Sequence, residues 1–256
     1  MSRPRAIVLR APGTNCDEET VAAWELAGAT AENWHVGRLI GSPHALDGFD
    51  ILTIPGGFSY GDDLGAGRIF ATRLGTVLDE SLRRFHGRGG LTLGICNGFQ
   101  VLVRAGLLPG GPTANRATLT FNDSGHYESR WVRLIPVPGK TPFLKDGEPI
   151  ELAVGHGEGK FVVAENAALD SLTAAGQVVL RYVDDNDMPT QEYPANPNGS
   201  MGAVAGVCDA SGRIFGLMPH PDRFFDPLLH PRWTRDGLKS EGDGLRIFRN
   251  AVNALR

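Results

Sequence analysis

Short apolar runs alternate with segments of helical periodicity along the first half of the chain. The apolar runs are rich in branched residues and end in turns that contain Gly or Pro, which is typical of buried strands. We predict three such strands: Ala6–Arg10, Asp50–Ile54 and Leu91–Ile95. An amphipathic segment after each strand predicts a helix: from Thr14 or Asn15 to Gly28, Ile69–Phe85 and Asn97–Ala105. Strands that alternate with helices predict an α/β fold, with a mostly parallel, doubly wound sheet and helices on both faces.

The second half of the chain has a different pattern, in which turns separate short apolar strands. Six segments are predicted as strands: Trp131–Val137, Ile150–Val154, Phe161–Val163, Val178–Val183, Ala203–Cys208 and Ile214–Met218. Because no long helices are predicted between them, we expect hairpins or an antiparallel edge added to the sheet. A final helix, about Gly244–Leu255, places apolar residues at helical spacing. The sequence contains no evident linker, so we predict a single domain over residues 1–256.

Composition and charge exclude several classes of protein. The 256 residues are 41% hydrophobic and include 34 glycines without a fixed period, which excludes collagen-like and disordered chains. The net charge is −4 without a basic stripe, so we expect no nucleic-acid partner. The three cysteines form no CxxC pair, which argues against disulfides and structural zinc. No segment reaches the roughly 18 apolar residues of a membrane span. We expect a soluble, cytoplasmic protein without a metal site or membrane contact.

The most informative segment has the form strand, Gly-x-Cys-x-Gly, helix, with Cys96 at its centre. In a nucleophile elbow, a sharp turn between strand and helix lifts the central residue above the sheet. Gly94 and Gly98 fit such a turn, since the backbones around it approach too closely for a Cβ. A helix N-terminus favours the thiolate form of Cys96, and the N–H of Asn97 would face an oxyanion formed there. We therefore predict a nucleophile rather than a buried structural cysteine.

The other two cysteines are interpreted differently. Cys208 lies inside an apolar strand and is predicted to belong to the core. Cys16 falls in the turn after the first strand, at the sheet edge where Cys96 is also expected. We favour a structural role for Cys16.

A cysteine that performs acyl transfer needs a base and a group that orients the base. The best pair follows the predicted strand Ile214–Met218, where His220 and Asp222 flank Pro221. Pro221 favours an extended conformation at His220, and side chains two residues apart in an extended segment point to the same side. We therefore predict that Asp222 supports the imidazole of His220. The alternatives are a surface turn that faces water and a metal site, for which the sequence shows no clustered third ligand.

Glycine-rich turns supply further candidates. The Pro-Gly-Gly turn after the second strand would offer the N–H of Gly57 as a second oxyanion donor, although such a turn alone is ordinary. Two such turns also contain four polar residues: Ser59, Asp62, His156 and Glu158. These residues could bind substrate or dock a partner, or they could belong to ordinary turns between strands.

Together these motifs resemble those of the class I, or triad, glutamine amidotransferases. Within that family, the chain is most similar to the branch that serves phosphoribosylformylglycinamidine synthase. Six segments carry the resemblance in the family's order: Gly13–Asp17, Gly56–Asp62, Gly94–Gln100, His156–Gly159, Asn196–Ser200 and Leu217–Pro221. Two features depart from the family. Asp222 stands where Glu is typical, and the stretch Phe224–Gly242 is longer than the module requires and receives no role.

The resemblance implies a flavodoxin-like fold and a Cys–His–Asp triad that hydrolyses glutamine. Cys96 would attack the side-chain amide, with the oxyanion held by the N–H groups of Gly57 and Asn97. Gln100 would contact the bound glutamine, and His220 would protonate the departing ammonia and then activate water. The ammonia would pass to a large synthetase subunit, which uses ATP and Mg²⁺ to convert formylglycinamide ribonucleotide into its amidine. A small bridging subunit is a further candidate partner, and no cofactor is expected in this chain.

Three alternatives stay open on the sequence. A glutaminase subunit for another acceptor would use the same residues. A cysteine hydrolase or sensor of the DJ-1/PfpI type shares the cysteine elbow but lacks the Pro-His-x-acid motif at this position. A non-enzymatic binding subunit would require a broken triad, which the presence of Cys96, His220 and Asp222 disfavours.

Overall fold

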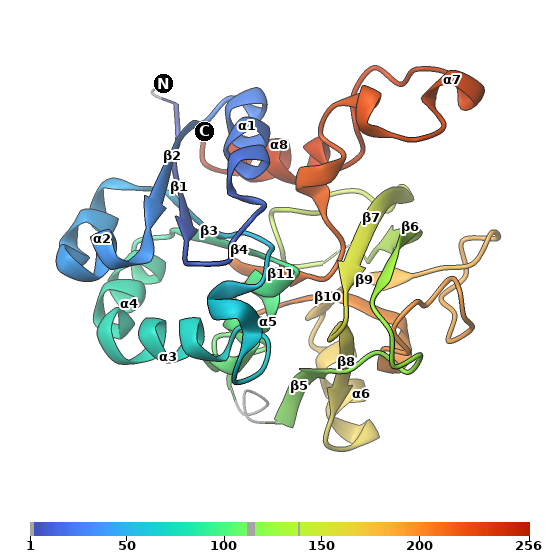
Figure 1. Cartoon of the computed structure of the whole chain (residues 1–256), viewed down its shortest axis with the longest axis horizontal. Helices are drawn as coiled ribbons and strands as arrows, with labels where there is room; N and C mark the ends of the chain where they lie inside the picture. The colour runs from blue at the N-terminus through green and yellow to red at the C-terminus, as the bar shows by residue number, and fades with distance from the viewer. Residues whose placement is uncertain (1–2, 112–115, 138) are drawn as a thin grey trace.

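The computed structural model describes residues 3–111, 116–137 and 139–256, which fold around one large sheet (Figure 1). The nine strands have the order β2-β1-β3-β4-β11-β10-β9-β6-β7, and β5 pairs with β8 in a second sheet. The strands are β1 Arg5–Arg10, β2 Thr30–His35, β3 Ile51–Ile54, β4 Leu91–Ile95, β5 Ala117–Thr120, β6 Glu128–Pro136, β7 Ile150–His156, β8 Lys160–Val163, β9 Val178–Tyr182, β10 Val204–Cys208 and β11 Ile214–Leu217. The helices are α1 Asp17–Ala27, α2 Val36–Gly41, α3 Arg68–Val77, α4 Asp79–Gly87, α5 Asn97–Arg104, α6 Asn166–Ala174, α7 Trp233–Asp236 and α8 Leu245–Ala254. Among the described residues, none of these helices is long and apolar enough to span a bilayer.

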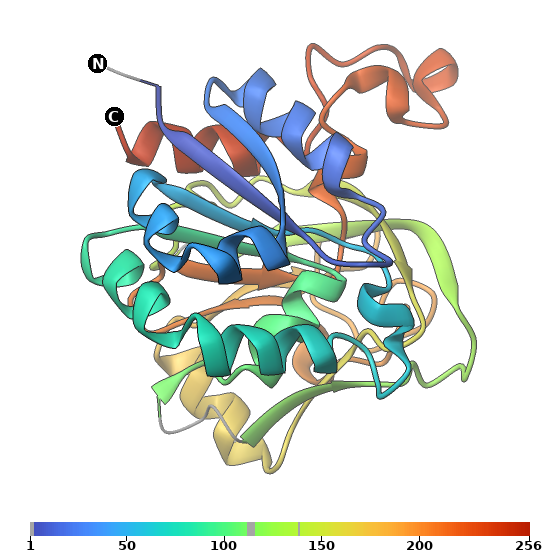
Figure 2. The ribbon, with the colours of Figure 1, turned by 60° about the vertical axis from the view of Figure 1, so that its left-hand side comes forward.

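The strands from β2 to β11 run parallel to their neighbours and form one half of the large sheet. Figure 2 shows helices on both faces of this half, with α1 and α8 packed together on one face and α3 and α5 on the other. The strand order reverses at β1, since β2 lies on one side of it and β3 and β4 on the other. The predicted doubly wound α/β sheet is confirmed, and sheets of this kind bind ligands beyond the carboxyl ends of their strands.

The strands β10, β9, β6 and β7 continue the sheet in antiparallel pairs. The predicted antiparallel edge is therefore confirmed. An isolated bridge joins Ala153 of β7 to His220, which follows β11. The far edge of the antiparallel half thus reaches back to the carboxyl end of the parallel half.

Several elements differ from the sequence prediction. The strand β2 is mostly polar and lies at the sheet edge, so no apolar run reveals it. The helix α6 occupies a stretch interpreted as a turn. The predicted helix Ile69–Phe85 is two helices, α3 and α4, which meet at Leu78. Residues 75–77 are weak helix formers and directly precede the break. The prediction of a single helix followed the buried leucines, which continue the apolar stripe on both sides of the break.

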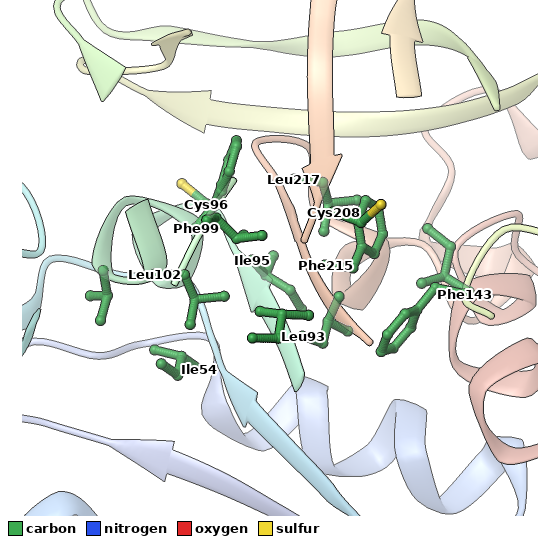
Figure 3. Packing of buried hydrophobic residues seen from close by; sticks show 14 of the residues in the cluster. Ile54, Leu93, Ile95, Cys96, Phe99, Leu102, Phe143, Cys208, Phe215 and Leu217 are labelled. Carbon is green, nitrogen blue, oxygen red and sulfur yellow. The ribbon is translucent and has the colours of Figure 1, made fainter. Parts of the chain in front are cut away.

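The turn from β4 into α5 brings two backbones into direct contact. A Cβ on Gly98 would overlap the carbonyl oxygen of Ile54 at the end of β3, and one on Gly94 would lie 2.5 Å from Cδ1 of Leu102. Buried apolar side chains of β3, β4 and α5 surround this contact (Figure 3). Because a close-packed interior leaves no room for the extra carbon, glycine is required at both positions, as the sequence predicts.

Gly98→Ala is expected to destabilise the fold by about 3 kcal/mol or more, because the new methyl group overlaps a backbone oxygen of β3. Gly75→Ala in α3 is the matched control. An added Cβ there meets nothing within 4 Å, so this variant should gain roughly 0.5–1 kcal/mol from better helix propensity. Urea unfolding measures both changes, and equal stability of the two variants would contradict the packing contact.

Candidate active site

Cys96 lies directly after β4, where the chain turns into α5 (Figure 3). Its φ of 50° and ψ of −104° fall in a region that residues with a side chain rarely adopt. The N–H of Cys96 donates to the carbonyl of Leu217 at 2.8 Å, and its carbonyl accepts from the N–H of Gln100 at 3.1 Å. The thiol donates to the carbonyl of Gly155 at 3.5 Å. The geometry of a nucleophile elbow is present at the predicted position.

His220 and Asp222 lie together in the loop after β11. The backbone N–H of His220 donates to the carbonyl of Ala153 in β7 at 2.8 Å, which supports its extended conformation. Nδ1 of His220 lies 3.3 Å from both carboxylate oxygens of Asp222, and the two residues are 1% and 0% exposed. Burial opposes a charged imidazole, but the charge and hydrogen bond of the Asp222 carboxylate outweigh it, so the pKa of His220 lies well above its usual range. Asp222 thus contacts the imidazole as the spacing predicts, and neither side chain faces water.

The other ring nitrogen of His220, Nε2, is the atom that can exchange a proton with a neighbour. It is buried, and among the described residues no group forms a hydrogen bond with it. Cys96 and His220 follow β4 and β11, which are adjacent parallel strands. With the carboxylate on the Nδ1 side, this arrangement has the form of a nucleophile, a base and an orienting acid.

A cavity of about 190 Å³ opens beside Cys96. Gly57 and Gln100 line it, together with the end of β7 and the two residues that follow it, Gly157 and Glu158. Its volume is below the roughly 300–1,000 Å³ of pockets for drug-sized ligands, so it fits a small metabolite. Gly57 has a φ of 141°, and a Cβ there would lie 2.8 Å from the backbone nitrogen of Asn15, which requires glycine. A larger hollow of about 440 Å³ lies between β6 and the segment that follows β9, and Cys96 does not line it.

Asn97 and Gln100 connect the walls of this cavity. The side-chain oxygen of Asn97 accepts from the N–H of Ser59 at 3.2 Å. Its amide nitrogen donates to Gln100 at 3.0 Å and to Asp62 at 3.2 Å. Gln100 in turn donates to the carbonyl of Glu158 at 2.6 Å. The sequence analysis considered only the backbone N–H of Asn97, and the structure adds a side chain that ties the turn after β3 to α5.

His156 lines the cavity and also belongs to a buried polar network. Its Nδ1 lies 3.1 Å from Oδ1 of Asn122, and its Nε2 lies 3.5 Å from Nδ2 of Asn198. Burial lowers the pKa of His156 to about 4, so the ring is neutral at neutral pH. Asn122 also donates to the carbonyl of His156 at 2.8 Å. Of the roles left open by the sequence, the contacts favour a structural one, in which His156 fixes the turn that lines the cavity.

The sequence analysis placed Cys16 at the sheet edge of Cys96 but did not predict that it lies beside His220. Its sulfur, a nitrogen of His220 and an oxygen of Asp222 lie within 4.8 Å of one another, and all three residues are buried. A third group able to bind a metal therefore lies beside His220, although Nη2 of Arg223, 3.2 Å from the sulfur, disfavours a cation there. Cys16 follows the first strand, and the loops after parallel strands meet at one edge of the sheet.

Comparison with known proteins identifies the class to which this fold and site belong. Residues 3–254 match the CobB/CobQ-like glutamine amidotransferase domain. The chain therefore belongs to the family of glutamine amidotransferases. A glutamine amidotransferase of Thermotoga maritima shares the fold, with a TM-score of 0.57 and 13% identity over 100% of this chain and 98% of that one.

Several relatives within this class are subunits of one synthase. The chain is 47% identical to phosphoribosylformylglycinamidine synthase subunit PurQ of Dehalococcoides mccartyi, over 100% of this chain and 99% of that protein. It is 41% identical to subunit PurQ of Treponema denticola, over 86% and 88%. A chain in the structure of PurLQS from Thermotoga maritima is 33% identical, with a TM-score of 0.75 and 100% of both chains covered. The resemblance found in the sequence motifs is confirmed.

Asp222→Asn is expected to preserve the fold but to lower glutamine turnover about 100-fold or more, because an amide cannot stabilise the imidazolium of His220. The loss should be smaller than for Cys96→Ala or His220→Ala, since the third member of such triads contributes least. Asp222→Glu should retain substantial activity, as Glu is the residue typical of the family. Steady-state glutaminase rates, measured with the synthetase partner present, decide this. Near-normal turnover of Asp222→Ala would leave a Cys–His dyad.

The buried His156 predicts a loss of stability at mildly acidic pH. Its pKa is near 6.5 in the unfolded chain and about 4 in the fold, so the unfolded chain binds more protons between these values and stability falls as pH falls. From pH 7 to pH 5 this residue should account for about 2 kcal/mol. Urea unfolding at both pH values should show a smaller loss for His156→Gln than for wild type. The exposed His126→Gln is the control and should keep the wild-type difference.

Proposed function

We propose that this chain is the glutaminase subunit of phosphoribosylformylglycinamidine synthase in de novo purine biosynthesis. It hydrolyses glutamine to glutamate and ammonia and delivers the ammonia to a synthetase subunit. That subunit uses ATP to convert formylglycinamide ribonucleotide into formylglycinamidine ribonucleotide. The observation that carries the proposal is the grouping of Cys96, His220 and Asp222 at one sheet edge, in a chain 47% identical over its full length to a PurQ subunit.

The site's geometry supports an acyl-transfer mechanism. His220 holds the proton of the Cys96 thiol at Nε2, and the sulfur attacks the side-chain carbonyl carbon of glutamine as the thiolate. Asp222 stabilises the imidazolium that forms. The N–H groups of Gly57 and Asn97 are the proposed donors to the oxyanion, and such groups act strongly because they are fixed before the charge develops.

Collapse of the oxyanion breaks the carbon–nitrogen bond, and His220 gives its proton to the departing nitrogen, which leaves as ammonia. A glutamyl thioester then remains on Cys96. His220 next removes a proton from water, which attacks the thioester and releases glutamate and the free thiol. The cavity of about 190 Å³ holds the substrate beside Cys96, and Gln100 in its wall is the proposed contact for the glutamine.

The ammonia must reach its acceptor without loss to water. We therefore propose that the chain works while docked on a synthetase subunit, which holds the ATP and Mg²⁺, and that a small third subunit completes the assembly. The PurLQS complex of Thermotoga maritima, which contains a chain 33% identical to this one, supports this proposal. Three free cysteines, all buried, favour the cytoplasm, where thiols stay reduced.

Cys96→Ala is expected to abolish glutamine-dependent amidine formation by the complex, because the variant cannot form the thioester. The rate with added ammonium salts should stay at the wild-type level, since the ATP-dependent step belongs to the partner. Measuring both rates on one preparation separates loss of ammonia production from loss of assembly. A Cys96→Ala complex that still used glutamine would show that another residue is the nucleophile.

A further inference from the structure

Cys16 lies beside His220 and the orienting acid, since its sulfur, a ring nitrogen of His220 and an oxygen of Asp222 lie within 4.8 Å of one another. It is 0% exposed, and its backbone N–H donates to the carbonyl of Gly56 at 3.3 Å. A Cβ added to Gly56 would lie 2.5 Å from Cε1 of His220, 3.3 Å from its Nδ1 and 3.3 Å from the sulfur of Cys16. The sulfur and the Nδ1 edge of the ring therefore border the same small space.

The hydrogen bonds of Cys16 leave its sulfur as an acceptor. The thiol donates to Oδ1 of Asn15 at 3.3 Å, and Nη2 of Arg223 donates to the sulfur at 3.2 Å. Burial is the main influence on this thiol and raises its pKa, so it stays protonated at neutral pH. Its contact with His220 supports the charged imidazole and adds to the raised pKa of His220.

The orienting acid leaves room for this second contact. Both oxygens of Asp222 lie 3.3 Å from Nδ1, whereas a charge-assisted N–H···O hydrogen bond is usually about 2.7–2.9 Å long. One oxygen of Asp222 is buried without a hydrogen-bond partner among the described residues. The carboxylate alone therefore does not hold the ring closely.

We propose that Cys16 is a positioning residue of the triad, which holds the Nδ1 edge of His220 together with Asp222 while Arg223 fixes its sulfur. This inference deepens the proposed function and rests on it. The sulfur keeps the imidazole from rotating and stabilises the ring when it is charged.

Other ionisable groups around this cluster must stay unchanged in a test. Those near the ring or next to Cys16 are Glu19, Cys96, Tyr127, His156, Asp222 and Arg223. Cys16→Ala removes the sulfur, and Cys16→Ser keeps a small acceptor there. Cys208→Ala is the matched control, because Cys208 is also 0% exposed but lies in β10 among core residues (Figure 3).

The first measurement is glutamine hydrolysis by each variant within the assembled complex. Cys16→Ala is expected to lower kcat roughly 10- to 100-fold with little change in KM, because the base is misplaced while the substrate cavity is intact. Cys16→Ser should recover most of that loss. Cys208→Ala should reduce thermal stability and leave kcat unchanged. The proposal fails if Cys16→Ala keeps the wild-type kcat. It also fails if the decrease in kcat is fully explained by the fraction of Cys16→Ala protein that is unfolded.

The second measurement is the pH dependence of Cys96 alkylation by iodoacetamide, followed by peptide mass. It uses neither glutamine nor an acceptor, so it tests the positioning role independently of the proposed function. Removing a group that stabilises the imidazolium makes the thiolate of Cys96 harder to form. The half-maximal pH should therefore rise by about half a unit or more in Cys16→Ala. An alkylation profile identical to wild type would overturn the proposal.

Discussion

The contact between the start of α5 and the end of β3 fixes the geometry on which the site depends. Gly98 lies so close to the carbonyl of Ile54 that no side chain fits between them. This packing forces the chain to turn sharply after β4, and the sharp turn gives Cys96 its unusual backbone conformation. The same contact places the Gly56–Gly57 turn, which follows β3, beside the thiol. One packing constraint thus brings the nucleophile and a candidate oxyanion donor to the same edge of the sheet.

The antiparallel half of the sheet completes the site instead of merely extending the core. Its strand β7 supplies the carbonyl of Ala153, which holds the backbone of His220, and the carbonyl of Gly155, which accepts from the thiol of Cys96. The turn after β7 closes the cavity and is held in place by the neutral ring of His156. Main-chain carbonyls of β7 therefore hold both His220 and Cys96, and these dipoles cannot be removed by exchanging a side chain.

The parts of the site that could be predicted have local signals. Cys96 and His220 each follow an apolar strand and are flanked by Gly or Pro, so spacing alone places them at strand ends. The contact of Cys16 with Arg223 joins residues 207 positions apart, and no periodicity reports such a pair. The break at Leu78 escaped prediction for a different reason: the apolar stripe faces the core on both sides of it. Polar edge strands such as β2 give no pattern because only one residue in it is buried.

The backbone conformation of Cys96 also has a consequence for how such chains change over evolutionary time. A residue with a side chain held at a positive φ of this kind costs of order 1–3 kcal/mol, and glycine would avoid that cost. Selection for stability alone would therefore replace the nucleophile by glycine. In a descendant that had lost the need for catalysis, position 96 should drift towards glycine before the surrounding core changes. The identity of this one residue would then serve as a record of whether a lineage still uses the chemistry.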